Sequence, residues 1–358
     1  MKNPLDIVKP CIRKLLPYTL RQYQYELKLN QNENPFDVPL ELKDKLLAYA
    51  RGRSWSRYPD FVPEEFHQKL AEYIGWTREG ILVGNGSNEL IKDICILVVE
   101  KNSKVIIPVP TFTLYNLIST ALGAEVVEVK LKSNYTFDME ALEKAVTIHS
   151  PALVFFSSPN NPTGCILPMN RLERILQKTN GLVVVDEAYC EFSDTTCLPL
   201  LEKYRNLIVL RTFSKAFSLA GLSIGYLIAD PELVREIAKV KLPYNLNFFS
   251  QMAATYALEN RELLQERIEY LRAQRDVVYK ALLKIPKVTP YPSQANFILF
   301  ETSVGVKDLF SNLLEKGVLI RDVSQYPMLS RALRVSIGKE EENQRFIQAL
   351  REAVDAVQ

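Results

Sequence analysis

The chain has 358 residues, enough for about two domains, and its 47% hydrophobic and 24% charged residues are typical of a soluble globular protein. A net charge of +2, without a block of Lys and Arg, gives no reason to expect nucleic acid as a partner. The two histidines, His67 and His149, lack ligand spacing, so we expect no histidine-based metal site and no catalytic triad.

The N-terminus has no apolar stretch typical of a secretion signal, and no apolar run reaches the ~18 residues that a membrane span needs. The five cysteines are odd in number and form no Cys-x-x-Cys pair, which is typical of free thiols in a reducing compartment. We therefore expect a cytoplasmic protein without a membrane partner.

The first candidate site follows an apolar run at residues 81–83, in the segment Gly-Asn-Gly-Ser-Asn-Glu-Leu at residues 84–90. Such a composition is typical of a junction from a strand to a helix, where backbone N–H groups face an anion at the positive end of the helix. The segment is neither a Gly-x-Gly-x-x-Gly motif nor a P-loop. It predicts a phosphate-binding loop with Gly86, Ser87 and Asn88 as its contacts.

Two further apolar runs end in polar residues. Residues 152–156 lead into Ser-Ser-Pro-Asn-Asn-Pro-Thr-Gly, whose prolines and glycine predict a fixed turn that presents the amide of Asn161. The valine-rich run 182–185 is typical of a strand buried on both faces; it ends in Asp186, and Tyr189 follows three residues on. Ligands of open α/β sheets bind at the carboxyl ends of such strands.

A lysine follows the next predicted strand, at residues 207–210, in the tetrad Thr-Phe-Ser-Lys at residues 212–215. A lysine wedged among apolar residues is desolvated, which favours the neutral amine that attacks a carbonyl group. Ser214 adds a hydroxyl that could hold a phosphate. Together they suggest that Lys215 carries pyridoxal phosphate (PLP) covalently, as a Schiff base.

A PLP cofactor gives each of the earlier segments a role. A carboxylate beside the pyridine nitrogen keeps the ring protonated and therefore a better electron sink, and we assign this role to Asp186. Tyr189 and Asn161 can reach the ring oxygen. Phosphate loop, amide, carboxylate and lysine also follow one another in the order used by PLP enzymes of fold type I.

The predicted elements divide the chain. Strand-like and helix-like segments alternate from about residue 81 to 230, which predicts an α/β fold with a mostly parallel sheet and helices on both faces. After residue 230, an amphipathic, charge-rich stretch and three short strand-like runs predict a smaller α+β unit. We expect an N-terminal arm at residues 1–35, a large PLP-binding domain at 36–245 and a small C-terminal domain at 246–358, with the pocket in the cleft between the two domains.

The chain resembles the class I and II aminotransferases, and among them most closely the histidinol-phosphate aminotransferase branch. The segments around Asp186 and Lys215 are specific to the superfamily, whereas Ser-Lys-Ala-Phe-x-Leu-Ala-Gly-Leu and Gln-Ala-Asn-Phe favour that branch. The resemblance runs nearly from end to end, through residues 29–35, 57–60, 84–89, 110–115, 160–164, 186–189, 211–226, 243–245, 293–297 and 333–338.

The resemblance implies further roles around the cofactor. Phe112 would stack on its ring, where an aromatic face fits. Tyr58 would reach the PLP phosphate of a neighbouring subunit, which implies a homodimer. The N-terminal arm is expected to pack on the small domain.

The resemblance also implies a substrate site. Arg334 would bind the substrate carboxylate, because a guanidinium matches a carboxylate with two hydrogen bonds. Tyr18 and Arg321 are candidates for the phosphate end of the substrate. Asn34, in one of the matching segments, is assigned to the substrate site as well.

The function that this resemblance implies is transamination between histidinol phosphate and 2-oxoglutarate, with imidazole-acetol phosphate and glutamate as products, in histidine biosynthesis. Three alternatives stay open: a threonine-phosphate decarboxylase, an aromatic amino acid aminotransferase, and a non-catalytic regulatory protein with the same fold. Intact Lys215 and Asp186, and the lack of a fused DNA-binding segment, count against the last.

Two positions depart from the family pattern. Ser223 stands where the family usually has an arginine that binds the PLP phosphate, and a serine can donate a hydrogen bond but carries no charge. Asn88 stands where an acidic residue is common. Arg211 is the first cation to consider as a replacement at the phosphate.

Overall fold

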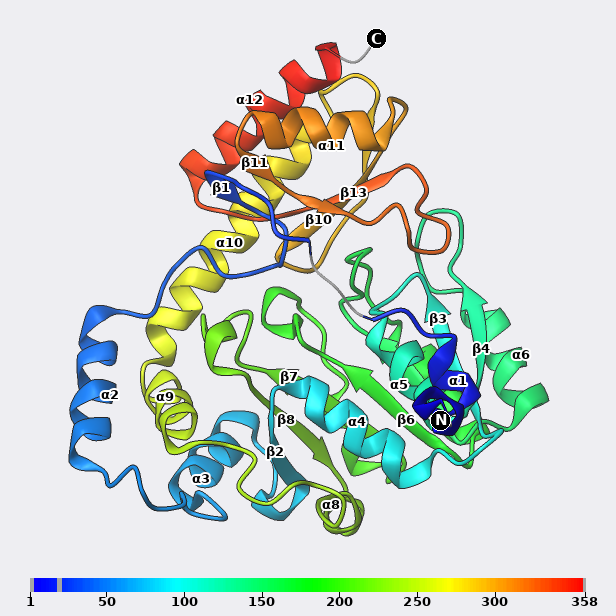
Figure 1. The fold of residues 1–358 in the computed structure, drawn as a ribbon, viewed down its shortest axis with the longest axis vertical. Coiled ribbons are helices and arrows are strands. Elements are labelled where there is room, and N and C mark those ends of the chain that lie inside the picture. The colour runs from blue at the N-terminus through cyan, green and yellow to red at the C-terminus, as the bar shows by residue number, and fades with distance from the viewer. Residues whose placement is uncertain (1–2, 18–20, 357–358) are drawn as a thin grey trace.

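The computed structural model describes residues 3–17 and 21–356. Its centre is a seven-stranded sheet (Figure 1). In order across the sheet, the strands are β2 (Ile81–Asn85), β8 (Ile224–Ala229), β7 (Leu207–Thr212), β6 (Leu182–Asp186), β5 (Leu153–Ser157), β3 (Lys104–Val109) and β4 (Glu125–Lys130). Neighbouring strands are parallel, except that β8 runs antiparallel to both β2 and β7. The predicted α/β fold with a mostly parallel sheet is therefore confirmed.

Helices cover both faces of this sheet, because successive strand residues point to opposite faces and both sets are apolar. On β3, Val105 and Ile107 pack into one core while Ile106 packs into the other. The first core is shared with α4 (Ser87–Val98), α5 (Leu114–Leu122) and α8 (Pro231–Ala238). The second is shared with α3 (Glu64–Ile74), α6 (Met139–His149), α7 (Met169–Lys178) and α9 (Phe248–Glu259). We call this sheet with its helices the large unit.

A second sheet of four antiparallel strands forms the small unit. Its order is β12 (Arg321–Asp322), β13 (Ala332–Ser336), β10 (Phe297–Thr302) and β9 (Val288–Pro290). It packs with α11 (Val306–Glu315) and α12 (Glu340–Ala356), and the long helix α10 (Arg261–Leu282) runs from the large unit into it (Figure 1).

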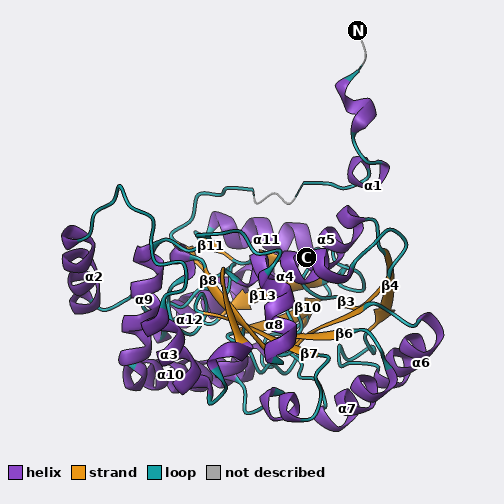
Figure 2. Cartoon of the chain, turned by 90° about the horizontal axis from the view of Figure 1, so that it is seen from below, coloured by secondary structure: helices purple, strands orange, loops and turns teal. Residues whose placement is uncertain are grey.

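The N-terminal segment contacts both units. β1 (Leu27–Lys28) pairs in parallel with β11 (Val318–Leu319) of the small unit. Upstream, η1 (Pro4–Ile7) is followed by α1 (Pro10–Arg13), which lies beside α5, and Cys11 Sγ donates to the Ala121 carbonyl over 3.8 Å. Figure 2 shows the N-terminal end extending away from the body of the chain. The domain boundaries at residues 35 and 245, and the arm's packing on the small domain, stay predictions.

The remaining segments connect these parts. α2 (Leu40–Gly52) lies beside α9, and four single-turn helices follow later in the chain: η2 (Arg78–Gly80), η3 (Cys190–Phe192), η4 (Leu198–Glu202) and η5 (Ala220–Leu222). Within the described ranges, no helix is long and apolar enough to span a membrane.

Three neighbouring strands place polar residues at one edge of the large sheet. β5 ends at Ser157, β6 at Asp186 and β7 at Thr212, and Ser157 pairs directly with Asp186 in the ladder. The carboxyl ends of parallel strands are where ligands bind in open α/β sheets. We therefore expect the ligand-binding site at this edge of the large sheet.

Candidate active site

A cavity of about 390 Å³ lies at this edge and is lined by residues of both units. From the large unit come Asn85, Gly86, Ser87, Asn88, Phe112, Tyr115, Ser157, Asn161, Asp186, Ala188, Tyr189, Thr212, Ser214, Lys215, Ala220 and Ser223. The N-terminal segment adds Asn30, Gln31 and Asn32, and the small unit adds Arg321, Tyr326 and Arg334. An apolar groove of similar volume, about 400 Å³, lies between α2 and α9 and carries none of the predicted site residues.

Lys215 lines this cavity and is half-buried. Its Nζ donates to the Gln31 carbonyl over 3.1 Å and lies 5.9 Å from the centre of the Tyr189 ring. Burial, together with the nearby Arg334 cation, lowers the pKa of Lys215 to about 8. The amine can therefore lose its proton near neutral pH, as an attacking amine or a general base must.

Asp186 is held by two donors. The Tyr115 hydroxyl donates to Oδ2 over 2.7 Å, and the Ala188 N–H donates to Oδ1 over 3.0 Å. Burial nevertheless raises the pKa of Asp186 to about 6, because the carboxylate is only 4% exposed. A cation placed against this carboxylate would restore its charged form.

Tyr189 is fixed in place by the N-terminal segment. The Asn32 amide donates to the Tyr189 hydroxyl over 3.0 Å, and Asn32 is itself bonded through its backbone N–H and its side chain to Ser336 Oγ on β13. The Tyr189 ring meets Phe297 edge to face, with centroids 5.1 Å apart. Residues far apart in sequence thus orient one hydroxyl.

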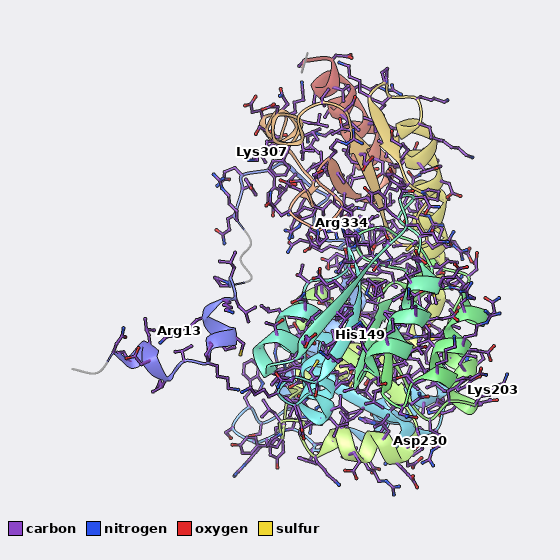
Figure 3. The ribbon with its side chains drawn as sticks, turned by 90° about the vertical axis from the view of Figure 1, so that its right-hand side faces the viewer. Arg13, His149, Lys203, Asp230, Lys307 and Arg334 are labelled. Atoms are coloured by element: carbon purple, nitrogen blue, oxygen red, sulfur yellow. The ribbon has the colours of Figure 1, made fainter. Side chains whose placement is uncertain are left out.

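Two arginines of the small unit line the cavity. Arg321 on β12 and Arg334 on β13 are direct cross-strand partners, so their side chains lie on the same face of the sheet. Arg334 donates from Nη1 to Asn161 Oδ1 over 2.5 Å and from Nη2 to the Asn30 carbonyl over 2.7 Å. In Figure 3, Arg334 lies where the small unit faces the large one. This end of the cavity is suited to anions.

The predicted phosphate loop lines the cavity at the start of α4. Gly86 has a φ of 75°, which favours glycine, and the helix begins at Ser87. Behind the loop, a Cβ on Gly225 of β8 would lie 2.3 Å from the Ser87 nitrogen, so only glycine permits this approach. Ser214 and Ser223 also line the cavity.

Arg211 is directed away from the cavity. Its Nε and Nη2 donate to Glu187 Oε2 over 3.0 and 2.8 Å, and Nη2 also donates to Thr196 Oγ1 over 2.9 Å. This ion pair is buried in the core on the other face of β7 from the cavity-lining Thr212. Arg211 therefore does not replace the arginine that is missing at Ser223; the cations that line the cavity, among the described residues, are Lys215, Arg321 and Arg334.

Two residues assigned from the sequence, Asn34 and Tyr58, do not line the cavity. Asn34 donates to the Ala216 carbonyl over 2.9 Å and supports the segment after Lys215 without lining the cavity. Tyr58 is 81% exposed and stacks on Tyr244, with ring centroids 4.5 Å apart. Tyr18 lies outside the described residues.

Several cavity residues were not assigned from the sequence. They include Asn32, Tyr115 and Tyr326. Asn32 and Tyr115 lie in segments that match the family, at residues 29–35 and 110–115. This match is the sequence signal that could have identified them as site residues. Tyr326 lies in a loop without a recognisable pattern, so no sequence signal pointed to it.

The fold is that of PLP-dependent enzymes of fold type I. The sequence model described as "Aminotransferase class I and II" matches residues 25–350, and the chain therefore belongs to the class I and II aminotransferase family, whose members depend on PLP.

The names of individual relatives indicate a narrower activity than the family description does. The chain is 38% identical to histidinol-phosphate aminotransferase of Chlorobium phaeovibrioides, over 98% of this chain and 97% of the relative. It is also 38% identical to the enzyme of the same name from Chlorobaculum tepidum, over 96% and 99% of the two chains. A crystal structure of histidinol-phosphate aminotransferase from Sinorhizobium meliloti in complex with pyridoxal-5'-phosphate is similar, with a TM-score of 0.87, 26% identity and 97% of each chain covered.

Proposed function

We propose that this aminotransferase exchanges amino groups between histidinol phosphate and 2-oxoglutarate, and in reverse between glutamate and imidazole-acetol phosphate. The observation that carries the proposal is the pair Arg321 and Arg334, side by side at the cavity that holds Lys215 and Asp186. Each substrate carries an anion, a phosphate or carboxylates, that an arginine can bind. Relatives at 38% identity bear the corresponding name.

The residues present fit a PLP molecule. We propose that Asp186 bonds the ring nitrogen, that Tyr189 and Asn161 face the ring oxygen, and that Phe112 packs on the ring. The raised pKa of the buried Asp186 fits this assignment, because a protonated ring nitrogen would supply the positive charge that stabilises the carboxylate. The phosphate would lie against Gly86, Ser87, Asn88, Ser214 and Ser223, which line the cavity. When bound, PLP supplies the conjugated ring that withdraws electrons from the substrate carbon.

Lys215 is assigned two tasks. It attaches the cofactor, and its amine then carries the proton that leaves the substrate carbon. An ordinary lysine amine is almost wholly protonated at neutral pH, whereas the lowered pKa of about 8 makes the neutral form available.

The two arginines are assigned to the substrate anions. Arg334, held in place by Asn161 and the Asn30 carbonyl, would bind the carboxylate of glutamate or 2-oxoglutarate. Arg321 would bind the phosphate of histidinol phosphate, with Tyr18 as a further candidate.

We propose that the enzyme is a cytoplasmic homodimer in which Tyr58 reaches the cofactor phosphate of the partner subunit. Large aromatic side chains are exposed near one another: Trp55 is 76%, Tyr58 81% and Phe61 60% exposed, and both Tyr58 and Phe61 contact Tyr244. Clustered exposed aromatic residues mark protein interfaces. Nothing in the composition favours a nucleic acid or a membrane as partner.

The proposal is tested by mixing the holoenzyme separately with histidinol phosphate, glutamate, phenylalanine and threonine phosphate, and following the cofactor spectrum. We expect fast spectral conversion with histidinol phosphate and glutamate. Preference for phenylalanine would make the enzyme an aromatic aminotransferase, and release of carbon dioxide from threonine phosphate would make it a decarboxylase. Either result overturns the proposed substrate.

A further inference from the structure

The phosphate loop is supported from outside the cavity by a carboxylate on its own helix. Glu89, in the first turn of α4, accepts the Asn85 backbone N–H on Oε2 over 2.6 Å. A glutamate in the first turn that reaches back to a backbone N–H is the second half of a capping box. Here it reaches one residue before the N-cap Gly86, so it closes the loop that precedes the helix.

The same carboxylate oxygen is held from a second segment. The Asn245 amide donates to Glu89 Oε2 over 2.7 Å, and Asn245 Oδ1 accepts from Lys241 Nζ over 2.7 Å. The residues 241–245 follow α8 and lie more than 150 positions away in the chain. Three side chains in a row therefore connect the 241–245 segment to the loop backbone.

None of these three side chains lines the cavity, whereas Asn85, Gly86, Ser87 and Asn88 all do. Glu89 thus acts on a ligand in the cavity only through the loop. Gly225 also supports the loop, because it packs against its back. Together, the β8 backbone and Glu89 fix where the loop N–H groups point.

The negative charge of Glu89 explains why its contact with the loop needs a cation nearby. A carboxylate near a bound phosphate is unfavourable by itself, although the positive end of α4 favours it. Lys241 offsets it, and the buried Asp93 is a further acidic neighbour, itself near Lys92 and Lys241. Because Ser223 brings no charge, the phosphate depends more on accurate placement of the loop N–H groups than it would beside an arginine.

We propose that Glu89, held by Asn245 and Lys241, is the positioning residue that orients the phosphate loop for the cofactor. This inference rests on the proposed placement of the cofactor phosphate at Gly86–Asn88, and not on the identity of the amino acid substrate. Glu89 is not a catalytic residue, because it does not contact the cofactor cavity.

The test compares cofactor affinities of purified protein that is stripped and reloaded with either PLP or pyridoxal, which lacks the phosphate. Glu89→Ala should weaken PLP binding by about ten- to a hundredfold, the range expected for losing a hydrogen bond to a charged group, and leave pyridoxal binding unchanged. Glu89→Gln should restore most of the affinity, since a carbonyl oxygen can accept both N–H groups. Asn245→Ala should show a smaller loss of the same kind.

Glu140→Ala is the matched control, because Glu140 is an exposed glutamate in the first turn of α6. Unchanged PLP affinity in Glu89→Ala, or equal losses for PLP and pyridoxal, would overturn the inference. If Glu89→Ala does not fold, the same comparison in Asn245→Ala decides it: a loss of PLP affinity without a loss of pyridoxal affinity supports the inference, and unchanged PLP affinity overturns it. Cofactor binding is the readout, so a wrong assignment of the amino acid substrate would not affect the result.

Discussion

The buried carboxyl of Asp186 lowers the stability of the folded chain at neutral pH. Burial raises the pKa of its carboxyl from 3.8 to about 6, so the folded, cofactor-free chain binds a proton more readily than the unfolded chain between these values. The folding stability that this proton binding contributes is fully present below pH 3.8 and is lost as the pH rises through 6. At pH 7 the buried carboxylate costs about 3 kcal/mol.

Asp186→Asn should therefore stabilise the cofactor-free protein at pH 7 by up to about 3 kcal/mol, and by about 1 kcal/mol at pH 4.5. Turnover of the loaded variant should fall by orders of magnitude, because the ring nitrogen loses its counter-charge. Urea unfolding at the two pH values measures the first effect, with the exposed Asp44→Asn as control. A variant with normal turnover, or with a pH-independent change in stability, contradicts the assignment.

Lys215 is expected to be the only point of covalent cofactor attachment. Borohydride reduction of the holoenzyme should leave a pyridoxyl group on the peptide that contains residue 215, and Lys215→Ala should lose it. Lys203→Ala, at the outer edge of the large unit in Figure 3, should keep it. Mass spectrometry of the digested protein measures the tag; a tag on another lysine rejects the assignment.

Arg334 is expected to bind the carboxylate of the amino donor. Removing one partner of a buried, hydrogen-bonded charge pair typically costs on the order of 2–5 kcal/mol. Arg334→Ala should raise the KM for glutamate strongly, while PLP still binds. Arg331→Ala is the control, because Arg331 is largely exposed and pairs with Glu301. Unchanged kinetics with glutamate in Arg334→Ala would remove this residue from the substrate site.

At the scale of elements, the sequence predicted the strands well and their directions less well. Continuous apolar runs indicate burial on both faces, which holds for parallel strands and for β8 alike, so nothing in residues 224–229 revealed its antiparallel direction. The position of Arg211 illustrates a second limit. It is four residues from Lys215, but strand alternation directs it to the opposite face and into a pair with Glu187.

The turn between η5 and β8 carries the departure at Ser223, whose φ is 49°. Because Arg211 is paired elsewhere, one charge-assisted contact to the phosphate is expected to be missing. Ser223→Arg should tighten PLP binding by about one to two orders of magnitude, since such a contact contributes roughly 1.5–3 kcal/mol. Loss of cofactor during dialysis measures it, and pyridoxal should show no gain. Unchanged or weaker PLP affinity would contradict the missing contact.

At the scale of the whole molecule, the cavity is assembled from segments that no local pattern connects. Asn32 meets Tyr189, and Arg334 meets Asn161, across separations of 157 and 173 residues. The resemblance to a family could supply these residues one by one, but their hydrogen bonds follow from how the small unit packs on the large one. Asn34 illustrates the limit of assigning residues in this way. It stands in a segment that matches the family, but its side chain donates to the Ala216 carbonyl after Lys215 and does not line the cavity.

The proposed dimer predicts that two variants, each inactive alone, restore activity when they pair. If Tyr58 serves the partner's cofactor, a subunit with Tyr58→Ala and a subunit with Lys215→Ala should complement each other. The mixed dimer would hold one site with both Lys215 and a partner Tyr58, and one site with neither.

The two variants should be co-expressed and assayed at a PLP concentration where the Tyr58→Ala homodimer is inactive. Random pairing then predicts recovery of about a quarter of the wild-type activity, because about half of the dimers are mixed and each has one working site. The wild-type chain co-expressed with a Tyr58→Ala/Lys215→Ala double variant calibrates the pairing, because these mixed dimers hold no working site. Absence of recovery would mean that Tyr58 acts within its own subunit, where it stacks on Tyr244, and would contradict the proposed contact across the dimer.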